Sequence, residues 1–173
     1  MPEQALVSVI IPTRDREDVL PECLDRLLAD EPPPFEIIVI DASASEATQA
    51  VLQQYPSVVN IRVGNRPYSS GINRNIGISH AQGTIVAFID DDCYVRPGWL
   101  RALIQPFADP DIIATGGRII YHPWKHCKHG PPVATIDLDQ NILTGEWDRT
   151  LDHPVEVPHL AGGNCALRPH VTI

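Results

Sequence analysis

Four short apolar runs, rich in valine and isoleucine, recur through the first half of the chain and alternate with segments of helical periodicity. The runs are LVSVIIP (residues 6–12), FEIIVID (35–41), SVVNIRV (57–63) and TIVAFID (84–90). Runs of this kind are typical of strands that are buried on both faces, as in parallel sheets. Helices are expected after each run, at 16–30, 45–55, 69–83 and 97–107. The pattern predicts an α/β fold with a mostly parallel, Rossmann-like sheet flanked by helices.

Capping residues and prolines predict where these helices begin and end. Ser45 is the candidate N-cap of the second helix. Ser69 or Ser70 is the candidate N-cap of the third helix, which Gly83 is expected to close. The EPPP run ends the first helix, because proline cannot continue it. Pro97 is expected near the first turn of the fourth helix.

The size and composition of the chain fit one globular domain. It has 173 residues, of which 43% are hydrophobic and 20% charged, which suffices for one packed core. The net charge of −9, without a long basic run, disfavours nucleic acid or an anionic membrane as a partner. The cysteines are widely spaced, which disfavours a disulfide framework, and Cys93 is expected to be a small buried residue rather than a nucleophile. With neither a membrane-span pattern nor a signal-peptide pattern, a cytoplasmic protein is expected, membrane-associated only if a longer chain exists.

After about residue 116 the alternation of strands and helices ends. The remaining segment is rich in proline, glycine, histidine and tryptophan and holds only short strand-like pieces. We expect long loops that cover a site, together with edge strands. No second domain is expected.

Polar residues follow three of the predicted strands. Asp90, Asp91 and Asp92 come directly after the fourth run, Asp41 ends the second, and PTRDRED (12–18) follows the first. The carboxyl ends of parallel strands form one rim of a sheet, which is where ligands bind in such folds. Carboxylates one residue apart on a tight turn can hold a hard cation such as Mg²⁺ or Mn²⁺. The alternative is an acidic loop in water, but the shared rim with Asp41 favours the cation.

Four segments, in this order and spacing, resemble the nucleotide-sugar-dependent family 2 glycosyltransferases, which have the GT-A fold. They are VSVIIPTRDR, EIIVIDASASEAT, NRNIGISHAQGTIVAFIDDDCYVRPGWL and LAGGNCALRP, and they span nearly the whole chain. The resemblance implies inverting, metal-dependent transfer of a sugar from a nucleotide-diphosphate sugar to an acceptor hydroxyl. The donor would be linked to UDP, GDP or dTDP, the acceptor would be a carbohydrate or another hydroxyl compound, and the cofactor would be Mg²⁺ or Mn²⁺.

The resemblance also implies roles for individual residues. Asp90 and Asp92 would form the metal-binding DxD pair, with Asp92 the favoured direct ligand. The nucleotide would be contacted by Pro12, Thr13, Arg14, Asp41, Arg74 and Asp91. The sugar and acceptor pocket would be lined by Gly162, Gly163 and Asn164. Residues 1–173 would form a single domain, with a nucleotide-binding half at 1–115 and an incomplete acceptor-side half at 116–173.

Two features depart from the pattern of that family. Ala42 stands where many relatives have Asp or Asn, so recognition of the base is expected to differ. The catalytic base of the family comes from an acidic motif downstream of GGNCALRP, whereas this sequence ends at Ile173. The base is therefore unassigned and expected beyond Ile173. The alternative function is a non-catalytic or degenerate nucleotide-sugar-binding domain that lacks the base.

Other motifs give weaker indications. HPWKHCKHG (122–130) resembles half of a zinc site, but structural zinc needs a closed set of four ligands, so a lid or a loop that contacts the acceptor is favoured. Trp99 is expected in the core because of its helical spacing with Leu103, whereas Trp124 and Trp147 remain candidates for stacking on a sugar. Sugar nucleotidyltransferases and nicotinamide dehydrogenases are disfavoured, because no glycine-rich loop follows the first run.

Overall fold

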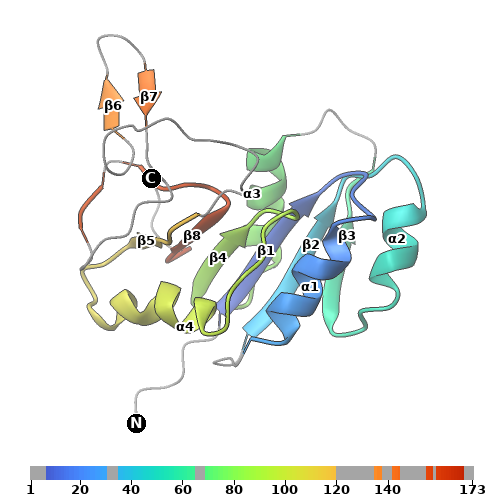
Figure 1. Ribbon diagram of the computed structural model, residues 1–173, viewed down its shortest axis with the longest axis horizontal. Coiled ribbons are helices and arrows are strands. Elements are labelled where there is room, and N and C mark those ends of the chain that lie inside the picture. The colour runs from blue at the N-terminus through green and yellow to red at the C-terminus, as the bar shows by residue number, and fades with distance from the viewer. Residues whose placement is uncertain are drawn as a thin grey trace.

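The main feature of the fold is a six-stranded sheet in the order β3-β2-β1-β4-β8-β5 (Figure 1). The computed structural model of the protein describes residues 7–30, 35–64, 69–119, 135–137, 142–144, 155–157 and 159–169. The strands of the sheet are β1 (Val7–Thr13), β2 (Phe35–Asp41), β3 (Val58–Arg62), β4 (Ile85–Ile89), β5 (Ala114–Gly116) and β8 (Asn164–Leu167). Two further strands, β6 (Thr135–Asp137) and β7 (Ile142–Thr144), pair with each other in a separate ribbon.

The first four strands are parallel, as the sequence predicts. β1 pairs in parallel with both β2 and β4, and β2 pairs in parallel with β3. Their carboxyl ends therefore meet at one edge of the sheet. β8 is antiparallel to β4 on one side and to β5 on the other. Edge strands were expected after residue 116, but the edge strand β5 ends at Gly116, and β8, which does lie in that segment, is inside the sheet.

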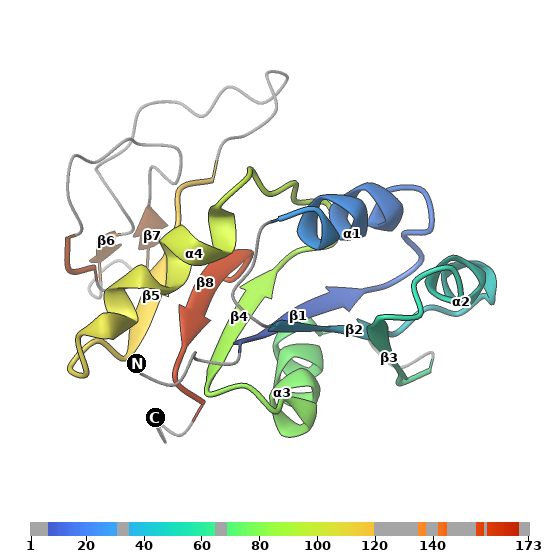
Figure 2. The same ribbon diagram turned by 90° about the horizontal axis from the view of Figure 1, so that it is seen from below.

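Helices cover both faces of the sheet, so the strands are buried on both sides. They are α1 (Leu20–Leu28), α2 (Ala47–Leu52), α3 (Ser70–His80) and α4 (Trp99–Ile104), the last continued by the 3₁₀ turn η1 (Gln105–Ala108). Figure 2 shows α1 and α4 on one face and α3 on the other. Alternate residues of β1 serve the two layers: Val9 and Ile11 pack with α1 and α4, whereas Ile10 packs on the side of α3.

The observed N-caps of α2 and α3 can be compared with the predicted serines. Ser69 is the N-cap of α3, and its Oγ accepts a hydrogen bond from the backbone N–H of Ile72 at 3.4 Å. The N-cap of α2 is Glu46 rather than the predicted Ser45. Ser45 still accepts a hydrogen bond from the backbone N–H of Ala47 at 3.3 Å, so it satisfies a donor of the first turn from one position further out.

Two predicted helix boundaries are wrong. α3 ends at His80, and the backbone N–H of Gly83 donates instead to Ser8 Oγ at 2.8 Å, which ties this turn to β1. α4 begins at Trp99, so Pro97 precedes the helix. The N-cap of α4 is Gly98 at φ +80°, a left-handed conformation that favours glycine.

None of the helices in the described ranges is long and apolar enough to cross a membrane. The HPWKHCKHG segment, Trp124 and Trp147 lie outside the described residues.

Candidate functional site

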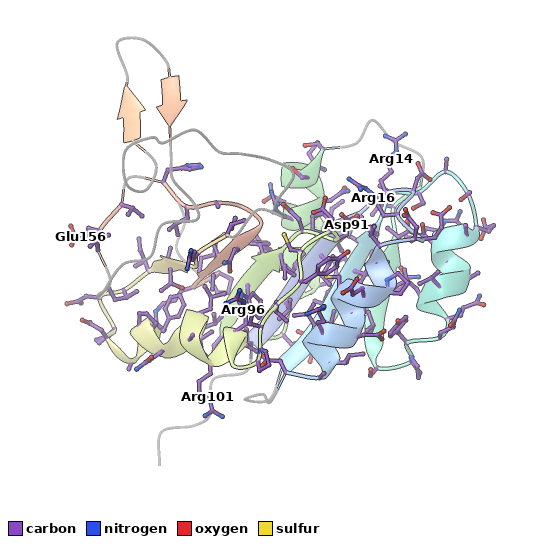
Figure 3. The ribbon with its side chains drawn as sticks, in the orientation of Figure 1. Arg14, Arg16, Asp91, Arg96, Arg101 and Glu156 are labelled. Atoms are coloured by element: carbon purple, nitrogen blue, oxygen red, sulfur yellow. The ribbon has the colours of Figure 1, made fainter. Side chains whose placement is uncertain are left out.

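A cavity of about 210 Å³ opens at the carboxyl ends of β1 and β4. Its lining residues are Pro12, Arg16, Ser70, Arg74, Asp90, Asp91 and Asp92. They come from the end of β1 and its loop, from the N-terminal half of α3, and from the turn after β4. In Figure 3, Arg14, Arg16 and Asp91 lie at this edge of the sheet, far from Arg101 on α4. The loop after β1 and the acidic turn, predicted to share a rim, therefore line one cavity.

Asp91 is the buried member of the acidic turn. Only 7% of this residue is exposed. The Thr13 hydroxyl donates a hydrogen bond to Asp91 Oδ2 at 2.7 Å, so the last residue of β1 fixes the carboxylate. Burial raises the pKa of Asp91, while the hydrogen bond from Thr13 and the charge of Arg16 act in the opposite direction. The structure thus keeps a partly desolvated carboxylate at the cavity wall.

Asp90 is paired with a guanidinium group. Arg74 Nη2 donates to Asp90 Oδ1 at 2.6 Å, and the Arg74 side chain is only 19% exposed. The guanidinium carbon also lies 5.9 Å from the centre of the Phe88 ring on β4. A short, charge-assisted contact of this kind, with one partner mostly buried and Asp90 43% exposed, is stronger than a loose ion pair at the surface.

Asp92 is the most open of the three carboxylates. Its side chain is 52% exposed, and the nearest cation is Arg16, whose Nη2 lies 3.7 Å from Asp92 Oδ2. An exposed pair at this distance contributes little energy, so either side chain can turn to a ligand at small cost.

The acidic turn offers the type of ligand that a divalent cation prefers, although its carboxylates are not gathered into a closed set. Asp90, Asp91 and Asp92 line one cavity and offer carboxylate oxygens, the ligands that Mg²⁺ and Mn²⁺ prefer. These ions take few protein ligands and leave positions for phosphate and water. Within the described ranges no three His, Cys, Asp or Glu side chains are gathered closely enough to hold an ion. Two of the three carboxylates are engaged by Thr13 and Arg74 in this arrangement.

Asp41 lies beside the cavity rather than in its lining. It is fully buried and pairs in register with Thr13 of β1. Its Oδ1 accepts a hydrogen bond from the backbone N–H of Ser43 at 2.8 Å, whereas Oδ2 has no hydrogen-bond partner among the described atoms. The backbone N–H of Asp15, a residue at φ +51°, donates to Ser43 Oγ at 2.8 Å. The loops after β1 and β2 are thus joined next to the cavity.

The GGN segment reaches the site from the far end of the sequence. Gly162 lies against the Arg74 guanidinium, and Gly163 lies against the Asp90 carboxylate. The Asn164 side chain is turned elsewhere: its Oδ1 accepts from Trp99 Nε1 at 2.9 Å, and its Nδ2 donates to the Arg118 carbonyl oxygen at 2.9 Å. The Asn164 amide therefore links the start of α4 to Arg118, two residues after the end of β5.

Arg16 and Ser70 line the cavity, although neither was predicted as a site residue. The signal for Arg16 was its place in the PTRDRED loop, where it stands two residues after Arg14. Ser70 was considered only as a helix cap, although its position at the start of α3 faces the rim. Cys93, beside the acidic turn, has its pKa raised to about 11 by burial and by the charges of Asp90 and Asp92, so its thiol stays protonated at neutral pH.

Comparison with solved structures identifies the fold. The mannosyltransferase PcManGT from Pyrobaculum calidifontis, in complex with GDP-Man and Mn²⁺, superposes with a TM-score of 0.60 at 22% identity, over 71% of this chain and 37% of that chain. Residues 1–349 of Staphylococcus aureus TarS, in complex with UDP-GlcNAc, give a TM-score of 0.57 at 24% identity, with the same coverage. The mostly parallel six-stranded sheet with its flanking helices is therefore the GT-A fold.

Comparison of sequences identifies the family. Glycosyltransferase AglE of Haloferax volcanii is 26% identical over 118 residues, which are 65% of this chain and 39% of that protein. Poly(ribitol-phosphate) beta-N-acetylglucosaminyltransferase TarS of Staphylococcus aureus is 30% identical over 99 residues, which are 54% of this chain and 17% of that protein. The chain thus spans less than half the length of either relative. The family model of glycosyl transferase family 2 matches residues 8–165, nearly the whole sequence, and the chain belongs to that family.

Proposed function

We propose that this chain binds the donor of an inverting, metal-dependent glycosyl transfer from a nucleotide-diphosphate sugar to an acceptor hydroxyl. One observation carries the proposal. The cavity at the carboxyl ends of β1 and β4 brings two guanidinium groups and three carboxylates together, on three separate elements. A diphosphate with a bound cation needs both signs of charge at close range, and few other ligands do.

The nucleotide would occupy the cavity and the loops beside it. Arg74 lines the cavity and carries the planar group that suits phosphate oxygens. Asp41, with one buried oxygen free of partners among the described atoms, would face the base or the ribose. The remaining nucleotide contacts are assigned to Pro12, Thr13, Arg14 and Asp91.

A divalent cation would be held by Asp92, the open carboxylate, together with Asp90. Bound there, Mg²⁺ or Mn²⁺ would stabilise the negative charge that develops on the leaving diphosphate. Thr13 would keep the intervening Asp91 in place, through the hydrogen bond at 2.7 Å.

The acceptor would approach from the side of residues 116–173, the proposed acceptor-side half, with residues 1–115 as the nucleotide-binding half of one domain. Gly162 and Gly163, which lie against Arg74 and Asp90, and Asn164 beside them would line the sugar and acceptor pocket. We assign no catalytic base among the described residues. The second candidate function is that of a nucleotide-sugar-binding domain without transfer activity. It would apply if the protein has no catalytic base.

The similar proteins support the proposed ligands. One structural neighbour was solved with GDP-Man and Mn²⁺ and another with UDP-GlcNAc, so nucleotide sugars and a divalent cation both occur on this fold. AglE is named as a glycosyltransferase, and the acceptor in the name of TarS, poly(ribitol-phosphate), agrees with a hydroxyl acceptor.

Calorimetric titration of UDP, GDP and dTDP into the chain, first with Mn²⁺ and then with EDTA, tests the donor site. We expect one nucleotide to bind with Mn²⁺, to bind at least about tenfold more weakly with EDTA, and to lose the metal effect in Asp92→Asn. Asp111→Asn, at an exposed residue outside the cavity, is the control and should bind like the unaltered chain. Absence of binding by all three nucleotides to a folded chain would refute the donor site, and binding unaffected by EDTA would refute the metal.

A further inference from the structure

We propose that Arg74 is an internal counter-ion that competes with a divalent cation for Asp90, and that Gly162 and Gly163 are positioning residues for this ion pair. The inference deepens the proposed function and rests on it for the identity of the donor. Its central statement, competition between Arg74 and a cation for one carboxylate, can be tested with the metal alone.

The first observation is the ion pair between Asp90 and Arg74. The N–O distance of 2.6 Å is that of a strong, charge-assisted hydrogen bond. The Arg74 side chain is mostly buried and lies over the Phe88 ring, and it also lines the cavity. A cation that coordinates Asp90 Oδ1 must displace Arg74 Nη2 from that oxygen.

The second observation is the fit of the two glycines around the pair. A Cβ added at Gly162 would lie 2.9 Å from Arg74 Nη1 and 3.2 Å from its Cζ. A Cβ added at Gly163 would overlap Asp90 Oδ2. The backbone just before β8 therefore packs directly against both charged groups, and any side chain at these two positions would push one of them away.

Competition for Asp90 would couple the binding of nucleotide to the binding of metal. When a diphosphate enters the cavity, its oxygens offer Arg74 a second anionic partner. Movement of the guanidinium toward the diphosphate frees Asp90 Oδ1 for the cation. Binding of nucleotide and binding of metal would then favour each other by the same factor, as thermodynamic linkage requires.

The first test is calorimetric titration of Mn²⁺ alone into the unaltered chain, Arg74→Gln, Asp90→Asn and the double variant. We expect Arg74→Gln to bind Mn²⁺ about tenfold more tightly, because Asp90 is freed. In the Asp90→Asn background, the Arg74→Gln change should have almost no effect. Simple long-range repulsion of the metal by Arg74 would persist in that background, so the cycle separates competition from repulsion.

The second test uses the glycines and keeps the charge of Arg74. Gly162→Ala should tighten Mn²⁺ binding by a smaller factor than Arg74→Gln, because the new methyl group displaces the guanidinium. Gly163→Ala should weaken Mn²⁺ binding, because it displaces Asp90 itself. Gly71→Ala is the matched control on α3: the nearest atom to its added Cβ is Ser69 Oγ at 3.9 Å, so Mn²⁺ affinity should not change.

Circular dichroism and thermal melting establish that each variant is folded before titration. Equal Mn²⁺ affinity in the unaltered chain, Arg74→Gln and Gly162→Ala would overturn the inference, as would an Arg74→Gln effect that survives in the Asp90→Asn background. Failure of the proposed function has a different result: no nucleotide binds with Mn²⁺, whatever the Mn²⁺ affinities of the variants.

Discussion

At the residue scale, the burial of Asp91 lowers the stability of the fold but keeps a carboxylate at the site. The carboxylate is held next to two other acids, with 7% of the residue exposed, and burial raises its pKa. The Thr13 hydroxyl, at 2.7 Å, offsets part of the cost of burying the charge. A residue that is ionised in such surroundings destabilises the folded chain, which is common where a group is kept for binding rather than for stability.

Replacement of Asp91 by Asn should therefore stabilise the chain at neutral pH. We expect the free energy of unfolding to rise by about 1 kcal/mol, because the charge is removed while an oxygen remains to accept from Thr13. The raised pKa fixes the pH dependence. The folded state binds the proton more readily than the unfolded state, so the penalty is full above the folded pKa of Asp91 and vanishes below its ordinary value of 3.8.

Urea unfolding of Asp91→Asn and of the unaltered chain, at neutral pH and near the ordinary pKa of 3.8, measures this difference. The gain should be largest at neutral pH and should shrink in acid. Thr13→Val in the unaltered chain should show the opposite sign at neutral pH. A gain that grows as the pH falls would contradict the assignment to Asp91.

At the scale of elements, single residues place the helix α3 against β1 and fix the start of α4. Gly77 of α3 lies against Ile10 of β1, which brings the helix and its Arg74 close to the sheet. The N-terminus of α4 is held by Asp30, which follows α1. The carboxylate of Asp30, 4% exposed, accepts from the backbone N–H groups of Gly98 at 2.5 Å and Leu100 at 3.1 Å.

Gly77→Ala should destabilise the fold although alanine favours a helix. An added Cβ would overlap Ile10 Cγ2 and lie 2.9 Å from its Cδ1, so we expect a loss of about 1–3 kcal/mol from overpacking. Gly71→Ala on the same helix meets open space and should be neutral or stabilising, by up to about 1 kcal/mol. Chemical denaturation of both variants gives the comparison, and equal stabilities would show that α3 does not lie as close to β1 as described.

Asp30→Ala should destabilise the chain by about 1–3 kcal/mol, because two buried backbone donors of α4 lose their acceptor. Asp30→Asn, which keeps one good acceptor, should recover part of this loss. The exposed Asp111 serves as control, and its change to Ala should stay within about 0.5 kcal/mol. Thermal melting of the three variants tests the cap; similar midpoints for Asp30→Ala and Asp111→Ala would refute it.

At the scale of the whole molecule, β8 lies in the sheet between β4 and β5, which precede it by dozens of residues. Its Cys165 pairs with Phe88 of β4 on one side and with Gly116 of β5 on the other. Just beyond β8, Arg168 donates to the backbone carbonyl oxygens of Ile112 at 3.1 Å and Phe107 at 2.9 Å. The segment that carries the two glycines is thereby fixed against β4, β5 and the end of η1.

A chain shortened after residue 158 should therefore lose stability, because β5 would lose its partner and β4 one of its two partners. We expect its melting temperature to fall by at least about 5 °C, with association through the exposed edge of β4. A chain shortened after residue 169 keeps β8 and Arg168 and should melt like the full sequence. Circular dichroism and size-exclusion chromatography measure both effects. Equal melting of the two shortened chains would mean that residues 1–115 fold without β8.

The sequence by itself determined the parallel core and the place of the acidic turn. Four runs of β-branched residues, each followed by a helical pattern, are local signals, and all four strands were predicted in order. The boundaries that failed, Gly83 for α3 and Pro97 for α4, depend on contacts outside the helix: Ser8 takes the N–H of Gly83, and Asp30 caps the helix after Gly98. Helix ends are set by tertiary hydrogen bonds as much as by local preference.

Only the tertiary structure decided what each polar residue contacts. The carboxylates of the DDD turn look equivalent in the sequence, yet Asp91 is buried against Thr13, Asp90 is paired with Arg74, and Asp92 is open. The position of β8 inside the sheet brings Gly163 to Asp90 across more than seventy residues of chain. The physical reason is that hydrophobic periodicity depends on residues that are close together in the sequence. Charge pairing and close backbone packing depend instead on which distant segments the fold brings together.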